Sequence, residues 1–336
     1  MRLHVVHETH YAYTPAVKTA QHQAHLVPAT LPCQRVLAHR LTIDPEPAQR
    51  RVFTDGWGNA GCFFSLQASH DQLRVVAESL VETSPRPQPA NAIAWETARE
   101  RMRYHRQAHW DPASEFLFAS PYVPRHEDFV AYARPSFTPG RPLLEAAQDL
   151  MHRIHREFAY QPQATDANTP ALEALALRRG VCQDFAQVMV GCLRSLGLPA
   201  RYVSGYLLTE PPPGQPRLVG ADASHAWASL YLPDEAEAAD GQKRAGTWTD
   251  LDPTNDRAPG PDYVTLAIGR DYGDVAPLRG VIQGSDHVLT VAVTVTPVED
   301  GASAVQTQSQ TQTQTLSQAK SQSQSQSQSQ TPGHAG

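Results

Sequence analysis

The chain has 336 residues, of which 28 are Lys or Arg and 34 are Asp or Glu, giving a formal net charge of −6. A net negative charge argues against nucleic-acid binding, and no apolar run approaches the roughly 20 residues of a membrane-spanning helix. The first residues lack a basic segment followed by an apolar one, so no signal peptide is recognisable, and four cysteines are too few for a disulfide framework. We therefore expect a reduced, cytoplasmic protein that binds neither nucleic acid nor membrane.

Residues 1–83 have the pattern of short β-strands. Runs rich in β-branched and aromatic residues, such as 2–13, 35–45 and 72–83, are separated by turn clusters of Pro, Gly, Asp and Asn. No helical period is recognisable in this part of the sequence. We predict a small antiparallel β-sandwich domain that ends before the Pro-rich segment 84–91.

Beyond residue 91 the hydrophobic period becomes that of helices. Apolar residues at steps of three and four predict a helix over 141–158, and a charged helix is expected before it, over 94–107. A shorter helix is expected over 169–179, with Thr169 as its N-cap and Pro170 at its first helical position.

The following segment carries the longest uninterrupted helical stripe. Its apolar face extends from Phe185 to Leu196, and Gly197 then ends the helix. Strand-like segments follow at 200–208, 224–233, 247–253 and 287–298. Helices followed by strands, without regular alternation, favour an α+β core over 84–300 that includes a helical lead-in over 84–160. The alternating Gln, Ser and Thr of 301–336 cannot bury enough apolar surface to fold, so a disordered tail is expected.

Cys182 lies in the first turn of the stripe-bearing helix, just after Gly180. Unpaired N–H groups and the positive end of the helix dipole favour a thiolate there, and the same N–H groups can stabilise an oxyanion. The alternative is a structural thiol, the role that we assign to Cys192 in the middle of the apolar stripe. Asp184, in the same first turn, is explained by its favourable interaction with the helix dipole.

His225 lies in one of the expected strands, and Asp252 ends the next one. A neutral His beside a thiol takes its proton, while a carboxylate behind the ring fixes the tautomer and stabilises the imidazolium. Cys182, His225 and Asp252 thus supply a nucleophile, a base and an orienting acid in chain order. Asp250 and Asn255, which flank Asp252, are the alternatives for the third role.

Other polar residues are weaker candidates for the site. The side chain of Gln183 could support an oxyanion, and Tyr160 could line a cleft. His4, His7 and His10 suggest a metal site, but in a strand His7 points away from the other two. We therefore expect no metal and no cofactor.

The ordered set GVCQDFA, LRSLGLPARYVSGYL, DASHAW and DLDPTN resembles the transglutaminase-like superfamily, in the bacterial branch with an extra N-terminal β domain. HETHYAYTPAV, HQAHLVPAT and DGWGNAGCFFSL are similar to that β domain, so the resemblance covers residues 1–298. It implies a papain-like α+β core with a Cys-His-Asp triad. Residue by residue, the triad corresponds to Cys182, His225 and Asp252.

Such a triad forms a thioester from an amide and releases ammonia or an amine. We expect water to attack the thioester, which makes the protein a peptidase, amidase or deamidase acting on a protein or peptide. Attack by an amine would instead make it a transglutaminase, and a catalytically idle protein-binding scaffold is a third alternative. A further hypothesis is that glutamines of the tail and Lys320 are the protein's own acyl donors and amine.

Overall fold

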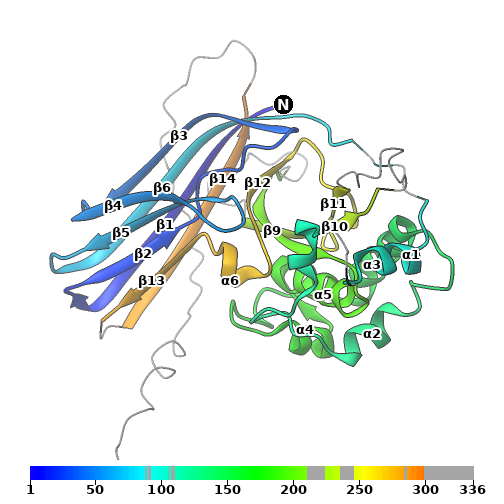
Figure 1. Ribbon diagram of the computed structural model, residues 1–336. Coiled ribbons are helices and arrows are strands. Elements are labelled where there is room, and N and C mark those ends of the chain that lie inside the picture. Colours follow the sequence, from blue (N-terminus) through cyan, green and yellow to red (C-terminus); the bar gives the residue numbers. More distant parts are fainter. Residues whose placement is uncertain are drawn as a thin grey trace, which may run out of the picture.

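The computed structural model describes residues 1–87, 89, 92–104, 106, 110–209, 224–234, 246–283 and 286–298. The expected disordered tail, with its glutamines and Lys320, lies outside these residues. In Figure 1 a sandwich of β-sheets stands beside a core in which helices cover a further sheet. Within the described ranges, no helix is long and apolar enough to span a bilayer.

The sandwich consists of two antiparallel four-stranded sheets. The first has the order β14-β1-β6-β3, with β1 at Arg2–Val17, β3 at Gln34–Asp44, β6 at His70–Thr83 and β14 at Asp286–Pro297. The second has the order β13-β2-β5-β4, with β2 at Ala20–Ala24, β4 at Gln49–Thr54, β5 at Ala60–Leu66 and β13 at Leu278–Ile282. Burial alternates along β1 from Leu3 onward, as a strand with one face in a core requires.

The last two strands lie in the sandwich, whereas the expected range 84–300 placed them in the core. β14 pairs with β1 along most of its length, and β13 pairs with β2. Alternation in the sequence predicts the strand at 287–298 correctly, but it carries no information about the partner strand. Burial of Val293 and Val295 among the side chains of the sandwich, together with the β1 ladder, determines that partner.

The core sheet is antiparallel, with the order β11-β10-β9-β12. Its strands are β9 at Ala200–Leu207, β10 at Ser224–Leu232, β11 at Thr247–Leu251 and β12 at Tyr263–Gly269. The helices are α1 at Trp95–Met102, α2 at Glu127–Ala133, α3 at Leu143–Glu157, α4 at Ala171–Leu177, α5 at Cys182–Ser195 and α6 at Tyr272–Val275, with a 3-10 turn η1 at Pro112–Leu117. Two short strands, β7 at Ala159–Tyr160 and β8 at Arg179–Gly180, pair in parallel. The expected α+β class is confirmed.

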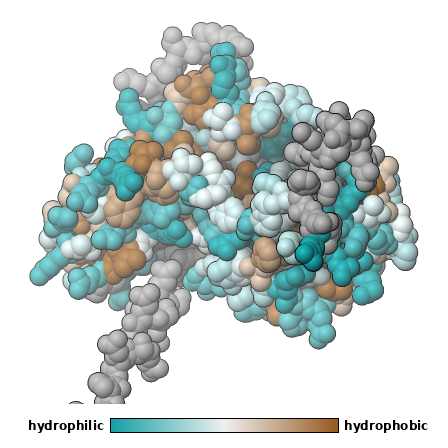
Figure 2. Space-filling view, in the orientation of Figure 1, coloured by the Kyte–Doolittle hydropathy of each residue, from teal (hydrophilic) through white to brown (hydrophobic). Residues whose placement is uncertain are grey.

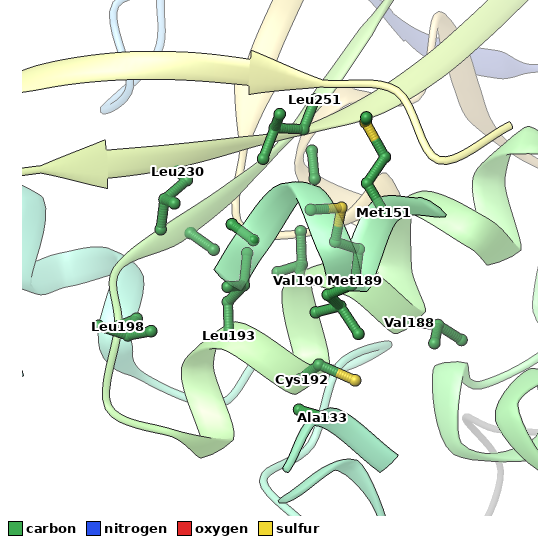
Figure 3. Close-up of a cluster of buried hydrophobic side chains, with 14 of the residues drawn as sticks. Ala133, Met151, Val188, Met189, Val190, Cys192, Leu193, Leu198, Leu230 and Leu251 are labelled. Atoms are coloured by element: carbon green, nitrogen blue, oxygen red, sulfur yellow. The ribbon is translucent and has the colours of Figure 1, made fainter. Parts of the chain in front are cut away.

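α5 is the central helix of the core. Figure 3 shows side chains of α5 packed with Ala133 of α2, Met151 of α3, Leu230 of β10 and Leu251 of β11. Cys192 lies in this cluster, where burial raises the pKa of its thiol far above the ordinary value, as a core residue requires. Because helices and strands enclose α5, the position of its first residue is set by the whole core.

Two of the expected helices differ in detail. The charged helix expected over 94–107 ends at Met102. In α4 the N-cap position belongs to Pro170, so the expectation of Thr169 as N-cap is wrong. The Thr169 hydroxyl instead accepts a hydrogen bond from the N–H of Asp166, which is 3.0 Å away. A Thr side chain can bond the preceding loop as readily as a helix start, and the sequence pattern does not distinguish the two.

The core sheet packs directly on the sandwich. Tyr206 of β9 and Val264 and Leu266 of β12 belong to the same buried cluster as the inner residues of the sandwich. The Gln34 side chain also bonds both the N–H and the C=O of Thr265, each at 2.7 Å. The sandwich and the core therefore bury apolar side chains against each other.

On the face drawn in Figure 2, hydrophobic residues are scattered among hydrophilic ones.

Candidate active site

Asp184 holds the turn that leads into α5 and Cys182. Its Oδ2 accepts hydrogen bonds from the N–H of Val181 at 2.8 Å and from the hydroxyl of Thr165 at 2.7 Å. A Cβ atom on Gly180 would lie 2.3 Å from that same oxygen, so only glycine leaves room for the carboxylate. Asp184 is buried, and burial raises the pKa of its carboxyl. Interaction with the helix dipole is therefore only part of its role, because Asp184 also fixes the position of the thiol.

Cys182 is the first residue of α5, and its thiol is half-buried. Its Sγ lies 3.9 Å from the carbonyl oxygen of Ser224, next to His225 in the chain. The N–H groups of Cys182 and Gln183 are in the first turn, where no carbonyl one turn earlier in the helix is available to them. They are the donors that the arrangement offers to an oxyanion. The Gln183 side chain itself donates to the carbonyl of Ala167 at 3.0 Å, so its amide is directed to the loop before α4.

His225 lies at the start of β10 and is buried. Its Nε2 is 2.7 Å from Oδ2 of Asp252. Nδ1 is not engaged by Asp252, so it is the ring nitrogen available to Cys182, whose Sγ lies against the carbonyl of the preceding residue, Ser224. Burial lowers the pKa of His225, but the hydrogen bonds to Asp252 and Cys182 and their charges outweigh burial and raise the pKa to about 10. The ring is therefore an imidazolium at neutral pH.

Asp252 is fully buried and surrounded by donors. Besides His225, its Oδ2 accepts hydrogen bonds from the hydroxyl of Tyr263 at 2.7 Å and the side-chain amide of Asn255 at 2.8 Å. Its Oδ1 accepts from the N–H groups of Thr254 at 2.9 Å and Asn255 at 3.2 Å. Burial raises the pKa of Asp252, but its bond to His225 and the other donors hold the pKa below the ordinary value. The site therefore contains an ionised carboxylate behind the imidazole.

The structure thus brings Cys182, His225 and Asp252 together. It also distinguishes Asp252 from Asp250 and Asn255, the two alternatives for the orienting acid. Asp250 forms an ion pair with Arg86 on the other side of β11 and does not contact the imidazole. Asn255 lies 3.2 Å from Nε2 of His225 and donates to Asp252, so it supports the carboxylate rather than replacing it.

Tyr263 is a site residue that the sequence pattern did not reveal. It lies eleven residues after Asp252, on β12, and reaches the carboxylate only because that strand pairs with β9. Its ring also packs against Trp227 and lies 5.9 Å from the ring of His225. No local signal distinguishes it from the other aromatic residues of the expected strands.

Aromatic side chains surround the thiol. Tyr160, on β7, is 57% exposed, and its ring centroid lies 6.4 Å from that of Phe185 in α5. Partial burial and the charge of Cys182 raise the pKa of Tyr160, and its contact with Phe185 places it against the first turn of α5. Tyr202 and Tyr272 belong to a small cluster with Cys182, and the sequence pattern singled out neither of them.

The N-terminal histidines have protein partners. His4 pairs with Glu78 on the surface, while His7 is buried and bonds the hydroxyl groups of Tyr206 and Thr9. In the part of the chain that the structure describes, no group of three or more His, Cys, Asp or Glu side chains is arranged to hold a metal ion.

Comparison with known proteins matches both parts of the chain. Residues 3–82 match the bacterial transglutaminase-like N-terminal region, and residues 130–253 match the transglutaminase-like superfamily. An uncharacterized protein of Mycobacterium tuberculosis is 41% identical over 310 residues, covering 90% of this chain and 94% of its own length. An uncharacterized protein of Mycobacterium leprae is 32% identical over 302 residues, covering 88% and 98% respectively.

Two further proteins are similar at longer range. A protein-glutamine gamma-glutamyltransferase of Pseudomonas aeruginosa is 34% identical over 108 residues, which are 31% of this chain and 14% of that enzyme. The crystal structure of "a Putative Cysteine Protease" from Cytophaga hutchinsonii has a TM-score of 0.65 at 18% identity, covering 91% of this chain and 94% of the other. That likeness shows a shared fold. The chain therefore belongs to the transglutaminase-like superfamily and carries the bacterial transglutaminase-like N-terminal region in front of its core.

Proposed function

We propose that the protein is a thiol-dependent amide hydrolase that acts on a peptide bond or a side-chain amide of a protein or peptide. The observation that carries this proposal is the position of Cys182 next to the Ser224–His225 segment, together with the hydrogen bond from His225 to the buried carboxylate of Asp252. The superfamily supports it, since its fold is typical of cysteine hydrolases and transferases. The three side chains come from α5, β10 and the end of β11, which the core packs against one another.

The first half of the proposed reaction forms a thioester. The thiolate of Cys182 attacks the amide carbonyl carbon, and the carbonyl electrons move to the oxygen, which the N–H groups at the start of α5 stabilise. As the C–N bond breaks, the imidazolium of His225 gives its proton to the leaving nitrogen, which departs as ammonia or an amine. The acyl group is then bound to Sγ, and His225 is neutral. Asp252 holds the ring in place throughout.

In the second half, water replaces the thiol. Neutral His225 removes a proton from the water molecule as its oxygen attacks the thioester carbonyl. The C–S bond breaks, the carboxylic acid is released, and the thiolate and imidazolium are restored. The partial exposure of Cys182 supports this step, because water can reach a thioester at a partly exposed thiol.

Acyl transfer to an amine is the second candidate function. It would use the same thioester, with an amine in place of water as the attacking group. The partial likeness to the Pseudomonas aeruginosa protein-glutamine gamma-glutamyltransferase supports this candidate, although it covers only 31% of the chain. Both candidates require the same triad and differ in the acceptor of the acyl group.

The experiment that tests the proposal measures ammonia release from glutamine-containing peptides by the full-length protein, with and without a fluorescent primary amine. We expect ammonia release without amine, a deamidated product by mass spectrometry, and complete loss of both in Cys182→Ala. Cys33→Ala, at another half-exposed cysteine, is the matched control and should retain activity. Incorporation of the amine in preference to hydrolysis would favour acyl transfer instead.

Labelling by iodoacetamide tests for an idle scaffold. In the enzyme we expect Cys182 to react faster than Cys33, and the buried Cys192 to remain unlabelled in the folded protein. If Cys182 reacted no faster than Cys33, or if Cys182→Ala still cleaved amides, the proposed mechanism would be rejected.

A further inference from the structure

The face of the core sheet that points away from α5 carries a row of polar side chains. Ala228 and Leu230 of β10 pack toward the helices. Because side chains alternate along a strand, the odd-numbered residues of β10 point to the other face. Ser229 lies at the centre of that face. The strand register places Arg201 of β9 on one side of Ser229 and Asp250 of β11 on the other.

Three donors on this face are buried without an acceptor. They are the hydroxyl of Ser229, Nε1 of Trp227 and Nε of Arg201, and none of them has a hydrogen-bond partner in the described part of the chain. Ser229 and Trp227 are both fully buried, and they are two residues apart on the same face of β10. Buried polar groups are nearly always hydrogen-bonded, so three neighbouring exceptions indicate a missing acceptor.

This face also carries more positive than negative charge. Arg86, which follows β6, forms an ion pair with Asp250, and its guanidinium lies 5.9 Å from the ring centroid of Trp227. Arg201 makes no ion pair with a carboxylate in the described ranges, and its guanidinium stacks on the ring of Trp248 at 4.1 Å. The face therefore has two guanidinium groups, those of Arg86 and Arg201, and Asp250 pairs with Arg86.

The carboxylate of Asp111 also interacts with this face. Asp111, before η1, accepts a hydrogen bond from the hydroxyl of Tyr231 at 2.6 Å and another from the N–H of Ala113 at 2.9 Å. These two bonds engage both carboxylate oxygens of Asp111. It therefore does not replace the missing partner of Arg201.

We propose that this face binds a small oxyanion, a carboxylate or a phosphate group, at Arg201 and Ser229. The planar guanidinium presents its N–H donors in a geometry that matches two oxygens of such a group, and a neighbouring hydroxyl can donate to one of them. The ligand supplies the acceptors that Arg201 Nε and Ser229 lack, and its negative charge compensates Arg201. Arg201 is partly exposed as a residue, whereas its Nε and the Ser229 hydroxyl are buried, so the proposed ligand lies below the protein surface. The proposal does not depend on the amide chemistry of Cys182.

Calorimetric titration and thermal unfolding of the full-length protein test this site. The probes are inorganic phosphate and acetate, added as sodium salts to Tris chloride buffer with the ionic strength held constant by sodium chloride. We expect at least one of them to bind with a stoichiometry of one and to raise the Tm saturably. Saturation by phosphate alone identifies a phosphate site, and saturation by acetate alone identifies a carboxylate site.

Three variants separate a specific site from a general salt effect. Arg201→Met removes the charge at similar length and should abolish both the binding heat and the saturable rise in Tm. Ser229→Ala keeps the charge and should weaken binding by about tenfold, the effect of one hydrogen bond to a charged group. Arg279→Met, at an arginine on β13 that bonds the carbonyl of Gly273, should respond as the wild type does.

Two results overturn the proposal. One is the absence of saturable binding for both anions. The other is an equal rise in Tm for the wild type and Arg201→Met, which would show stabilisation by salt and not by a site. If Arg201→Met does not fold, an unchanged affinity in Ser229→Ala rejects the site by itself.

Discussion

Asp252→Asn tests the ion pair on which the candidate site depends. The exchange keeps the size of the side chain and removes its negative charge from behind His225. In the wild type the pKa of His225 is raised from 6.5 to about 10, with the bond to Asp252 as the largest favourable cause. At 1.36 kcal/mol per pKa unit, this shift corresponds to roughly 3–5 kcal/mol of stabilisation of the imidazolium. Without the carboxylate, burial dominates, and we expect the pKa of His225 to fall below 6.5.

The sign of the effect on stability follows from the raised pKa. A group whose pKa is higher in the folded protein stabilises it fully below the unfolded value, and this contribution is lost as the pH rises through the folded value. The wild type should therefore lose the contribution of His225 between about pH 6.5 and pH 10. The difference in unfolding free energy between the wild type and Asp252→Asn should be largest just below about pH 6.5 and shrink toward pH 10.

NMR of histidine-labelled protein follows the protonation of His225, and urea unfolding at several pH values follows the stability. Amide hydrolysis by Asp252→Asn should fall by about a thousandfold or more, because the ring loses its preferred tautomer. Asp256→Asn is the matched control, since Asp256 lies in the same turn but pairs with His152. An imidazolium at His225 that persists at neutral pH in Asp252→Asn would refute the reasoning, as would a stability difference that does not change with pH.

Three further outcomes follow from the contacts of the site and the sandwich. Tyr263→Phe removes one hydrogen bond to the buried carboxylate of Asp252 and should lower the unfolding free energy by about 1.5–3 kcal/mol, measured by urea unfolding; an unchanged value would exclude a net contribution from that bond. Gly180→Ala forces a Cβ atom against Asp184, so we expect slower labelling of Cys182 by iodoacetamide and a lower Tm, and wild-type values for both would contradict the contact. A chain that ends before 286–297 lacks β14 and should lose cooperative unfolding of the sandwich in a calorimetric scan, whereas an unaltered transition would show that the strand is dispensable.

The candidate site could be predicted largely from local patterns. The apolar stripe from Phe185 onward identified a buried helix. The first residue of that helix is Cys182, which lies near His225, and His225 in turn bonds Asp252. The resemblance to the superfamily at DLDPTN favoured Asp252 over Asp250, and Asp252 is the carboxylate that bonds His225. These features are local because helix period, strand alternation and turn residues depend on neighbours within a few positions.

The tertiary structure decided which distant segments meet. The sequence determined that 287–298 forms a strand, but only the free edge of β1 and the burial available in the sandwich decided its partner. The contact of Tyr263 with Asp252 and the alignment of Arg201 with Ser229 likewise depend on which strands pair and in which register. Strand pairing joins residues far apart in the chain, and a local pattern carries no record of the partner.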